Sequence, residues 1–254
     1  MEALRLWAVV EYDGTDFAGF QVQARERTVQ GEIEHALEAV TGHSTRIAGA
    51  GRTDSGVHAS GQVISFSAPW QHGIPVLQRA LNAVLAADVA IVEIGPARGT
   101  FHPRYSATSR TYRYTIWNQE WRSPLWRRTA WHVKTPLDME HMAQASRYLI
   151  GTHDFATFGR PPEGREDAVR TVLGAGWSAR DRVLTFEIEA NAFLYRMVRS
   201  MVGTLVLVGQ GRLPAVEVAE MLRARDRSQV RQVAPAVGLC LTKVSYPVSE
   251  GVMQ

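Results

Sequence analysis

Alternating apolar and polar positions open the chain and return several times along it. Every second residue from Leu4 to Val10 is apolar, and this period of two predicts a strand with one buried face over Leu4–Glu11. Similar segments predict further strands over Gln62–Ser67, Val89–Ile94, Thr111–Ile116, Thr129–Val133, Val172–Ser178, Val183–Ala190 and Leu239–Tyr246.

Apolar residues at helical spacing predict helices between these strands. Val29, Ile33 and Leu37 recur at intervals of four, Thr28 is positioned to cap the start of this helix, and Thr41-Gly42 ends it. Further helices are predicted over Pro75–Leu85, Asp138–Leu149, about Phe193–Val208 and Pro214–Arg223. The first half of the chain is therefore predicted to be β-α-β-α-β, and the second half repeats this order in outline.

This mixture of elements favours an α+β fold with largely antiparallel sheet over a doubly wound parallel one. A connection rich in Pro, Gly and Arg extends from Gly95 to Ser109 and separates the halves, so we expect an N-terminal domain over 1–105 and a C-terminal domain over 106–254. The polar segment Gly159–Asp167 predicts a surface loop, either an inert tether or a basic flap over a substrate.

Composition narrows the class of protein. The chain has 254 residues, of which 45% are hydrophobic and 21% charged, and this excludes collagen-like and low-complexity proteins. The longest apolar run, Met201–Val208, is much shorter than the roughly 20 residues of a membrane span. The N-terminus has Glu2 and Arg5 flanking a strand-like alternation, and it does not resemble a secretory signal. We therefore expect a cytoplasmic protein with no membrane association.

The cysteine and basic residues have an unusual distribution. The single cysteine, Cys240, cannot form an internal disulfide, and its position between two leucines predicts a buried strand residue. The net charge is only +3, but Lys134 and Lys243 are the only lysines among 28 basic residues. Arginine binds phosphate through two parallel hydrogen bonds and stacks on bases, which suits nucleic acid, although a GC-rich genome or a hot habitat also enriches it.

The segment from Gly49 to Ala59, with the sequence GAGRTDSGVHA, is the most unusual stretch of the chain. Its three glycines in eight residues disfavour regular structure, so we expect a shaped loop just before a strand. This loop places the carboxylate of Asp54 between Arg52 and a tight turn.

Parts of this loop also match the sequence motifs of several other kinds of site. Gly49-x-Gly51 resembles the start of a dinucleotide-binding fingerprint, but Asp54 stands where the next glycine belongs. Asp54-Ser55-Gly56 matches the motif of aspartic proteases, which need a second carboxylate that a homodimer would supply. Asp54 and His58 form a weak pair of metal ligands, because no further ligand set is apparent. A turn in which Asp54 caps its own loop is the plain alternative.

The full string Gly51–Ala59 resembles the signature of TruA-type tRNA pseudouridine synthases. Segments that resemble other motifs of this family follow its order along nearly the whole chain: Tyr12–Thr15 with Phe17–Gln21, Thr28–Gly31, Phe101–Arg104 with Arg110–Tyr114, Asn191–Gly203, and Ala234–Leu239. The chain departs from the pattern at Tyr195-Arg196, where many members carry other polar residues.

The resemblance implies a fold of two RRM-like (ferredoxin-like) lobes whose largely antiparallel sheets join around a central cleft, usually in a homodimer. It implies an isomerase that converts uridine to pseudouridine at positions 38 to 40 of the tRNA anticodon stem-loop. Such an enzyme breaks the bond between N1 and C1′, turns the base, and joins C5 to C1′. Because the reaction involves neither redox change nor transfer to a second molecule, we expect tRNA as partner and no cofactor, metal or protein cofactor.

The resemblance also implies a catalytic role for Asp54. Its carboxylate would add to C6 of the uracil ring, attack C1′, or take a proton from C2′, and the sequence leaves these three routes open. Arg199 would keep that carboxylate ionised. The predicted helix around Arg199 is apolar over most of its circumference, and a buried arginine needs an anion. An arginine that reaches solvent from the helix edge is the alternative.

Two further residues receive catalytic roles by resemblance. Tyr112 would stack on the target base and handle the proton that leaves C5, although a tyrosine sharing a strand face with Tyr114 and Ile116 is also typical of a core. Arg52 would help to displace the uridine from its stack.

RNA of this kind is held mainly through its phosphates and shape. We expect substrate binding by Tyr112, Arg52, Arg104, Arg110 and Arg160, with Arg25, Arg27 and Arg165 as further candidates. Two other hypotheses remain: a non-catalytic RNA chaperone of the same fold, and a dimeric aspartic peptidase.

Overall fold

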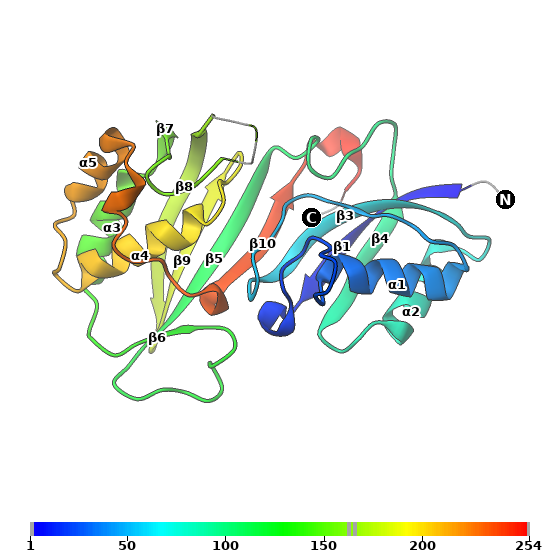
Figure 1. The fold of residues 1–254 in the computed structure, drawn as a ribbon, viewed down its shortest axis with the longest axis horizontal. Coiled ribbons are helices and arrows are strands. Elements are labelled where there is room, and N and C mark those ends of the chain that lie inside the picture. Colours follow the sequence, from blue (N-terminus) through cyan, green and yellow to red (C-terminus); the bar gives the residue numbers. More distant parts are fainter. Residues whose placement is uncertain (1–2, 162–163, 165–166, 253–254) are drawn as a thin grey trace. The chain divides into compact units, whose positions relative to one another are not determined.

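A computed structural model describes residues 3–161, 164 and 167–252 of the chain (Figure 1). These residues fall into two compact units. The first comprises Met1–Thr108 together with Cys240–Gln254, and the second comprises Ser109–Leu239.

The sheet of the first unit has the strand order β4-β1-β3-β10, with the short strand β2 added to β3. β1 pairs in antiparallel fashion with both β3 and β4, and β10 pairs in parallel with β3. Helices α1 and α2 contact each other and pack against β3 and β4, respectively (Figure 1). The bounds are Ala3–Tyr12 (β1), Ala48–Gly49 (β2), His58–Pro69 (β3), Val89–Pro96 (β4), Leu239–Ser245 (β10), Val29–Thr41 (α1) and Ile74–Val84 (α2).

Helix α1 shows how local sequence determines an element. The hydroxyl of Thr28 accepts a hydrogen bond of 3.3 Å from the amide of Gly31, and Gly42 ends the helix in the left-handed conformation with a φ of 73°. Ile33 and Leu37 lie one turn apart and are fully buried. Each such side chain contributes roughly 1.5–3 kcal/mol to the free energy of folding.

The sheet of the second unit has the order β5-β9-β8-β7, with antiparallel neighbours, and β6 is added in parallel to β5. Helix α4 is buried along its whole length apart from one residue, Arg199, and it packs against α3. The bounds are Ser109–Asn118 (β5), Trp131–Val133 (β6), Gly151–Asp154 (β7), Val169–Arg180 (β8), Val183–Ala190 (β9), Met139–Arg147 (α3), Met197–Gly209 (α4) and Glu217–Ala224 (α5).

Four 3-10 helices connect these elements, over Gly14–Asp16 (η1), Arg227–Gln229 (η2), Ala236–Gly238 (η3) and Val248–Glu250 (η4). Within the part of the chain that the structure describes, every helix is too short or too polar to cross a membrane.

The α+β class with largely antiparallel sheet is confirmed. The division of the chain differs from the expected 1–105 and 106–254, because the first unit extends to Thr108 and also takes the residues from Cys240 onward. The reason is the pairing of Cys240 and Leu241 with His58 and Ala59. The RRM-like character of the two lobes, and a cleft that they flank, stay predictions.

Candidate active site

The loop that carries Asp54 is fixed at its N-terminal side by hydrogen bonds to β1 and β3. The amide of Ala50 donates to the carbonyl of Val63 over 2.8 Å, and the side-chain amide of Gln62 donates to the carbonyl of Gly51 over 2.8 Å. The hydroxyls of Tyr12 and the buried Thr53 are 2.7 Å apart. The backbone immediately before Asp54 is therefore held in place by buried groups.

A tight turn fixes the other side of Asp54. Its carbonyl accepts a hydrogen bond of 3.1 Å from the amide of Val57, and Gly56 adopts a left-handed φ of 76°. The hydroxyl of Ser55 and the amide of Gly56 both donate to the carbonyl of Phe17, over 3.1 and 3.3 Å. Asp54 itself is half-buried. The loop thus combines a rigid backbone with a carboxylate that is not enclosed by the core.

The segment from residue 14 to residue 20 packs directly against this turn and needs its glycines. The amide of Phe20 donates to the carbonyl of Thr53 over 3.1 Å. Gly19 has a φ of 107°, and a Cβ there would lie 2.9 Å from the carbonyl oxygen of Thr53. A Cβ on Gly14 would lie only 2.0 Å from the carbonyl oxygen of Val57. Both glycines therefore allow backbone to approach backbone on either side of Asp54.

Replacing Gly14 with Ala should lower the free energy of unfolding by about 2–3 kcal/mol, because the clash is with backbone that cannot rotate away. Urea denaturation followed by circular dichroism measures this change. Gly176→Ala in β8 is the matched control, since a Cβ there meets nothing within 4 Å, and it should change the unfolding free energy by less than about 0.5 kcal/mol. Equal stability of the two variants would contradict the close approach.

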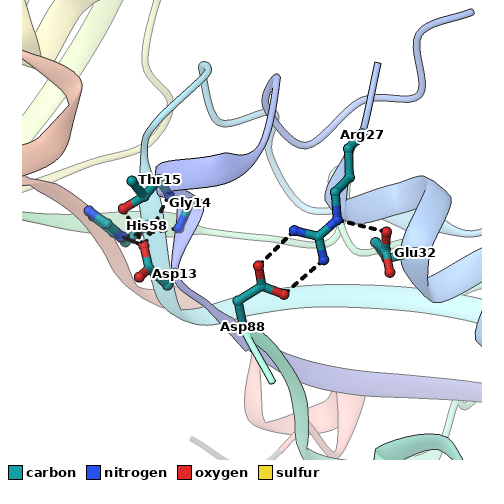
Figure 2. Close-up of polar contacts among 7 residues, drawn as sticks. All are labelled: Asp13, Gly14, Thr15, Arg27, Glu32, His58 and Asp88. Atoms are coloured by element: carbon teal, nitrogen blue, oxygen red, sulfur yellow. Dashed lines mark hydrogen bonds and ion pairs between the residues drawn. The ribbon is translucent and has the colours of Figure 1, made fainter. Parts of the chain in front are cut away.

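Asp13 and His58 join the same segment to the start of β3 (Figure 2). The Asp13 carboxylate accepts hydrogen bonds from the amide and hydroxyl of Thr15, over 3.0 and 2.5 Å. Nδ1 of the buried His58 lies 3.1 Å from the amide of Gly14 and 3.2 Å from Oδ1 of Asp13. His58 thereby serves the scaffold. Within the described residues, no three His, Cys, Asp or Glu side chains converge to form a group of metal ligands.

Arg27 is bound inside the first unit (Figure 2). Its guanidinium forms two hydrogen bonds with the Asp88 carboxylate, of 2.7 and 2.9 Å, and a third of 2.9 Å with Glu32. It also lies over the ring of Phe17, 4.1 Å from the centroid. These hydrogen bonds raise the pKa of Arg27 and lower that of Asp88. Arg27, one of the arginines expected to contact RNA, therefore has a clear structural role.

Replacing Asp88 with Asn should lower the free energy of unfolding by about 1 kcal/mol at pH 7. Because the folded state holds the pKa of Asp88 below its ordinary value, the unfolded state takes up the proton first as the pH falls. The stabilisation is therefore complete above the unfolded pKa of about 3.9 and disappears as the pH falls through the folded pKa. Urea titrations between pH 7 and pH 3 should show that the difference in unfolding free energy between wild type and variant becomes smaller as the pH falls. A constant difference would contradict the ion pair.

In the second unit, Tyr112 is almost completely buried, with 8% of its surface exposed. It lies on β5 opposite Ile188 of β9, and its ring meets that of Phe193 edge-on, with centroids 5.0 Å apart. Arg110, two residues earlier, donates from Nη1 to the carbonyl of Asn191 over 2.9 Å. The start of β5 is therefore joined to the segment that precedes α4.

Arg199 is half-buried on α4. Its Nε donates to the carbonyl of Ala234 over 2.8 Å, and the amide of Ala234 donates back to the carbonyl of Arg199 over 2.9 Å. A Cβ on Gly203, one turn later, would lie 2.2 Å from the carbonyl oxygen of Gln232, so the segment from Gln232 to Ala234 passes the helix at close range. The hydroxyl of Tyr114 donates a hydrogen bond of 2.8 Å to the carbonyl of Pro235. Burial raises the pKa of Tyr114, and the positive charge of Arg199 opposes that rise.

The expected site residues are divided between the units. Asp54 and Arg52 share one loop of the first unit, where Arg52 is exposed. Arg104 is also in the first unit, exposed, with its guanidinium 5.8 Å from the ring centroid of Tyr105. The second unit contains Tyr112, Arg110, Arg160 and Arg199. Arg165 lies outside the described residues.

The scaffold around Asp54 was not predictable from the candidate site residues alone. Tyr12, Gly14 and Gly19 lie in segments that resemble family motifs, and the structure shows that they hold the loop. Their signal in the sequence is the spacing of glycine in Asp13-Gly14-Thr15 and Ala18-Gly19-Phe20.

Comparisons with protein-family models and with curated proteins point to the same family. The family model for tRNA pseudouridine synthases matches residues 8–106 and 145–247. Among curated relatives, tRNA pseudouridine synthase A of Thermoanaerobacter sp. (strain X514) is 41% identical, over 94% of this chain and 98% of its own. The protein of the same name from Chloroflexus aurantiacus (strain ATCC 29366 / DSM 635 / J-10-fl) is 45% identical, over 94% of this chain and 87% of its own.

A third relative, tRNA pseudouridine synthase A of Moorella thermoacetica, is 44% identical, over 92% of this chain and 96% of its own. A solved structure of an H/ACA RNP bound to a substrate RNA containing 2′-deoxyuridine aligns with a TM-score of 0.37 and 11% identity, over 79% of this chain and 44% of that chain, which is too distant to inform the fold. The family model covers both units, and the relatives match almost the entire chain. The chain belongs to the tRNA pseudouridine synthase family.

Proposed function

We propose that this protein isomerises uridine to pseudouridine at positions 38 to 40 of the tRNA anticodon stem-loop. The observation that carries the proposal is the Asp54 loop, in which buried hydrogen bonds fix the backbone while the carboxylate is only half-buried, within a chain of the tRNA pseudouridine synthase family. The reaction breaks the N1–C1′ bond, rotates the base, and forms the C5–C1′ bond. It needs a carboxylate held in a defined position beside the sugar and base.

Asp54 is proposed as the catalytic carboxylate, acting at C6, at C1′ or at the C2′ proton. Arg199 is proposed as the cation that favours its ionised form. The hydrogen bond from Nε of Arg199 to the carbonyl of Ala234 supports this role, because it fixes the position of the guanidinium on a helix that is otherwise buried.

Tyr112 is proposed to stack on the target base and to handle the C5 proton. Its edge-on contact with Phe193 supports a fixed ring orientation. Arg52 is proposed to displace the uridine from its stack, and its exposure on the loop that carries Asp54 supports this assignment.

Arg104, Arg110 and Arg160 are proposed to bind the substrate through its phosphates. Arg104 is exposed, while Arg110 already donates one hydrogen bond to Asn191. A homodimer, a cytoplasmic location and the absence of any cofactor or protein cofactor complete the proposal.

The experiment is incubation of the purified protein with an unmodified tRNA transcript, followed by mapping of pseudouridine at each position. The proposal predicts pseudouridine at positions 38 to 40 and none in a transcript whose uridines there are replaced by cytidine. Binding without modification would support an RNA chaperone instead, and cleavage of peptides without any effect on RNA would support an aspartic peptidase.

A further inference from the structure

Two arginines of the second unit, Arg160 and Arg196, contact Tyr195, and a third, Arg227, lies within electrostatic range of them. Arg160 and Tyr195 are joined by two backbone hydrogen bonds, of 3.3 and 3.0 Å, although they are far apart in the sequence. Arg196 places its guanidinium over the Tyr195 ring, 5.0 Å from the centroid. Burial lowers the pKa of Arg227, at the start of η2, and the positive charges of Arg160 and Arg196 lower it further.

Arg227 is half-buried and has one guanidinium nitrogen that is shielded from solvent. Its Nη1 is buried and has no hydrogen-bond partner among the residues that the structure describes. The neighbouring carboxylate of Asp226 is occupied by Ser228, accepting from its amide over 2.9 Å and from its hydroxyl over 2.7 Å. Asp226 therefore caps η2 and forms no ion pair with Arg227.

The cluster also differs from the other arginines nearby. Arg223 pairs with Glu220, and Arg225 lies 3.3 Å from Asp154, whereas no described carboxylate forms an ion pair with Arg160, Arg196 or Arg227. Neighbouring like charges repel, and a buried N–H without an acceptor destabilises the protein. An anion with several oxygens would remove both penalties at once.

The backbone conformation of Arg196 also supports a binding site at this cluster of arginines. Arg196 precedes α4 with a φ of 60°, a left-handed conformation that non-glycine residues rarely adopt. Such strain is retained where the surrounding structure imposes it, often at binding sites. Arg196 is also the position at which this chain departs from the pattern that its family resemblance suggests.

We propose that Arg160, Arg196 and Arg227 form a binding site for a backbone phosphate of the RNA substrate, next to the Tyr195 ring. This inference rests on the proposed function and adds Arg196 and Arg227 to the residues assigned to substrate binding. RNA is favoured over a free phosphate ion because Tyr195 is 50% exposed and offers a flat surface for an unstacked base beside the phosphate.

The test measures tRNA affinity across a range of salt concentrations for Arg196→Asn and Arg227→Gln. Asparagine tolerates the left-handed conformation of Arg196, so the first variant removes the charge without adding strain. Each variant should bind tRNA about 5- to 10-fold more weakly at about 0.1 M salt, and the slope of log affinity against log salt should become shallower by about one. The loss should appear in KM more than in kcat.

Arg225→Asn is the matched control. Arg225 also adopts a left-handed φ, of 51°, and loses the same charge, but it already pairs with Asp154. It should bind tRNA within about twofold of wild type. If Arg225→Asn lost as much tRNA affinity as the other two variants, the loss would reflect net charge alone, and the proposed site would be overturned.

A titration with inorganic phosphate distinguishes a site for a backbone phosphate of RNA from a site for a free phosphate ion. Removing the repulsion should leave Arg227→Gln at least as stable as wild type, so the variant should fold, and added phosphate should raise the Tm of wild type more than that of the variant. A phosphate effect on Tm with an unchanged tRNA salt slope would overturn the assignment to RNA. Activity lost in Asp54→Asn but a wild-type salt slope in both arginine variants would overturn this inference alone and leave the proposed function standing.

Discussion

Replacing Asp54 with Asn should slow pseudouridine formation by at least about 10⁴-fold, the scale of loss when a covalent or proton-transfer group is removed. Asparagine has almost the same shape, and the turn depends on the backbone carbonyl of Asp54 and the amide of Val57, so the loop should keep its conformation. The affinity for tRNA should stay within about twofold of wild type. Single-turnover kinetics with excess enzyme measures the rate, and filter binding measures the affinity.

Asp181→Asn is the control for this variant, because it removes one carboxylate from a position with a left-handed φ of 54° in the second unit. It should retain the wild-type rate. A residual rate in Asp54→Asn within about tenfold of wild type would remove Asp54 from the chemistry, and the Asp54 loop would then be a structural turn.

Arg199→Ala should lower the rate of the chemical step by about 10²- to 10³-fold while weakening tRNA binding by no more than about threefold. The physical reason is that a positive charge stabilises the ionised carboxylate proposed for catalysis and does little for the binding of distant phosphates. The same two assays, applied to this variant, separate rate from affinity. Equal losses in both would contradict the proposed role.

Arg199→Lys separates charge from position. Lysine keeps the charge but cannot donate from an Nε to the carbonyl of Ala234, a hydrogen bond that Arg199 makes over 2.8 Å. This variant should recover part of the rate lost in Arg199→Ala. A rate as low as that of Arg199→Ala, in a variant whose urea denaturation shows wild-type stability, would mean that charge is not what Arg199 provides.

Elements defined by local signals were predictable from the sequence. Helix α1 has its cap, its apolar spacing and its final glycine within fifteen consecutive residues, and the predicted helix agrees with the structure. Helix α4 begins at Met197 instead of Phe193, because Arg196 leaves the helical region of φ. The short strands β2 and β7 were not predicted, since two to four residues carry too little periodicity to mark a strand.

Features that depend on distant partners were not predictable. No local pattern shows that Leu241 pairs with Ala59, so the expected C-terminal domain extended to residue 254. A single arginine likewise gives no sign that its partner lies 61 residues away, as Asp88 does for Arg27. The glycines predict that the Asp54 loop has an irregular backbone. The hydrogen bond between Tyr12 and Thr53 that fixes this loop joins residues far apart in the sequence, so no local pattern predicts it.

The most direct measurement of the central claim uses tRNA in which only the uridines at positions 38 to 40 carry tritium at C5. Forming the C5–C1′ bond displaces that hydrogen, so the wild-type protein should release one tritium to water for each uridine converted. The Asp54→Asn protein, at equal tRNA occupancy, should release none above background. Tritium release that persists without the Asp54 carboxylate, or its absence with the wild-type protein bound to tRNA, would contradict the account.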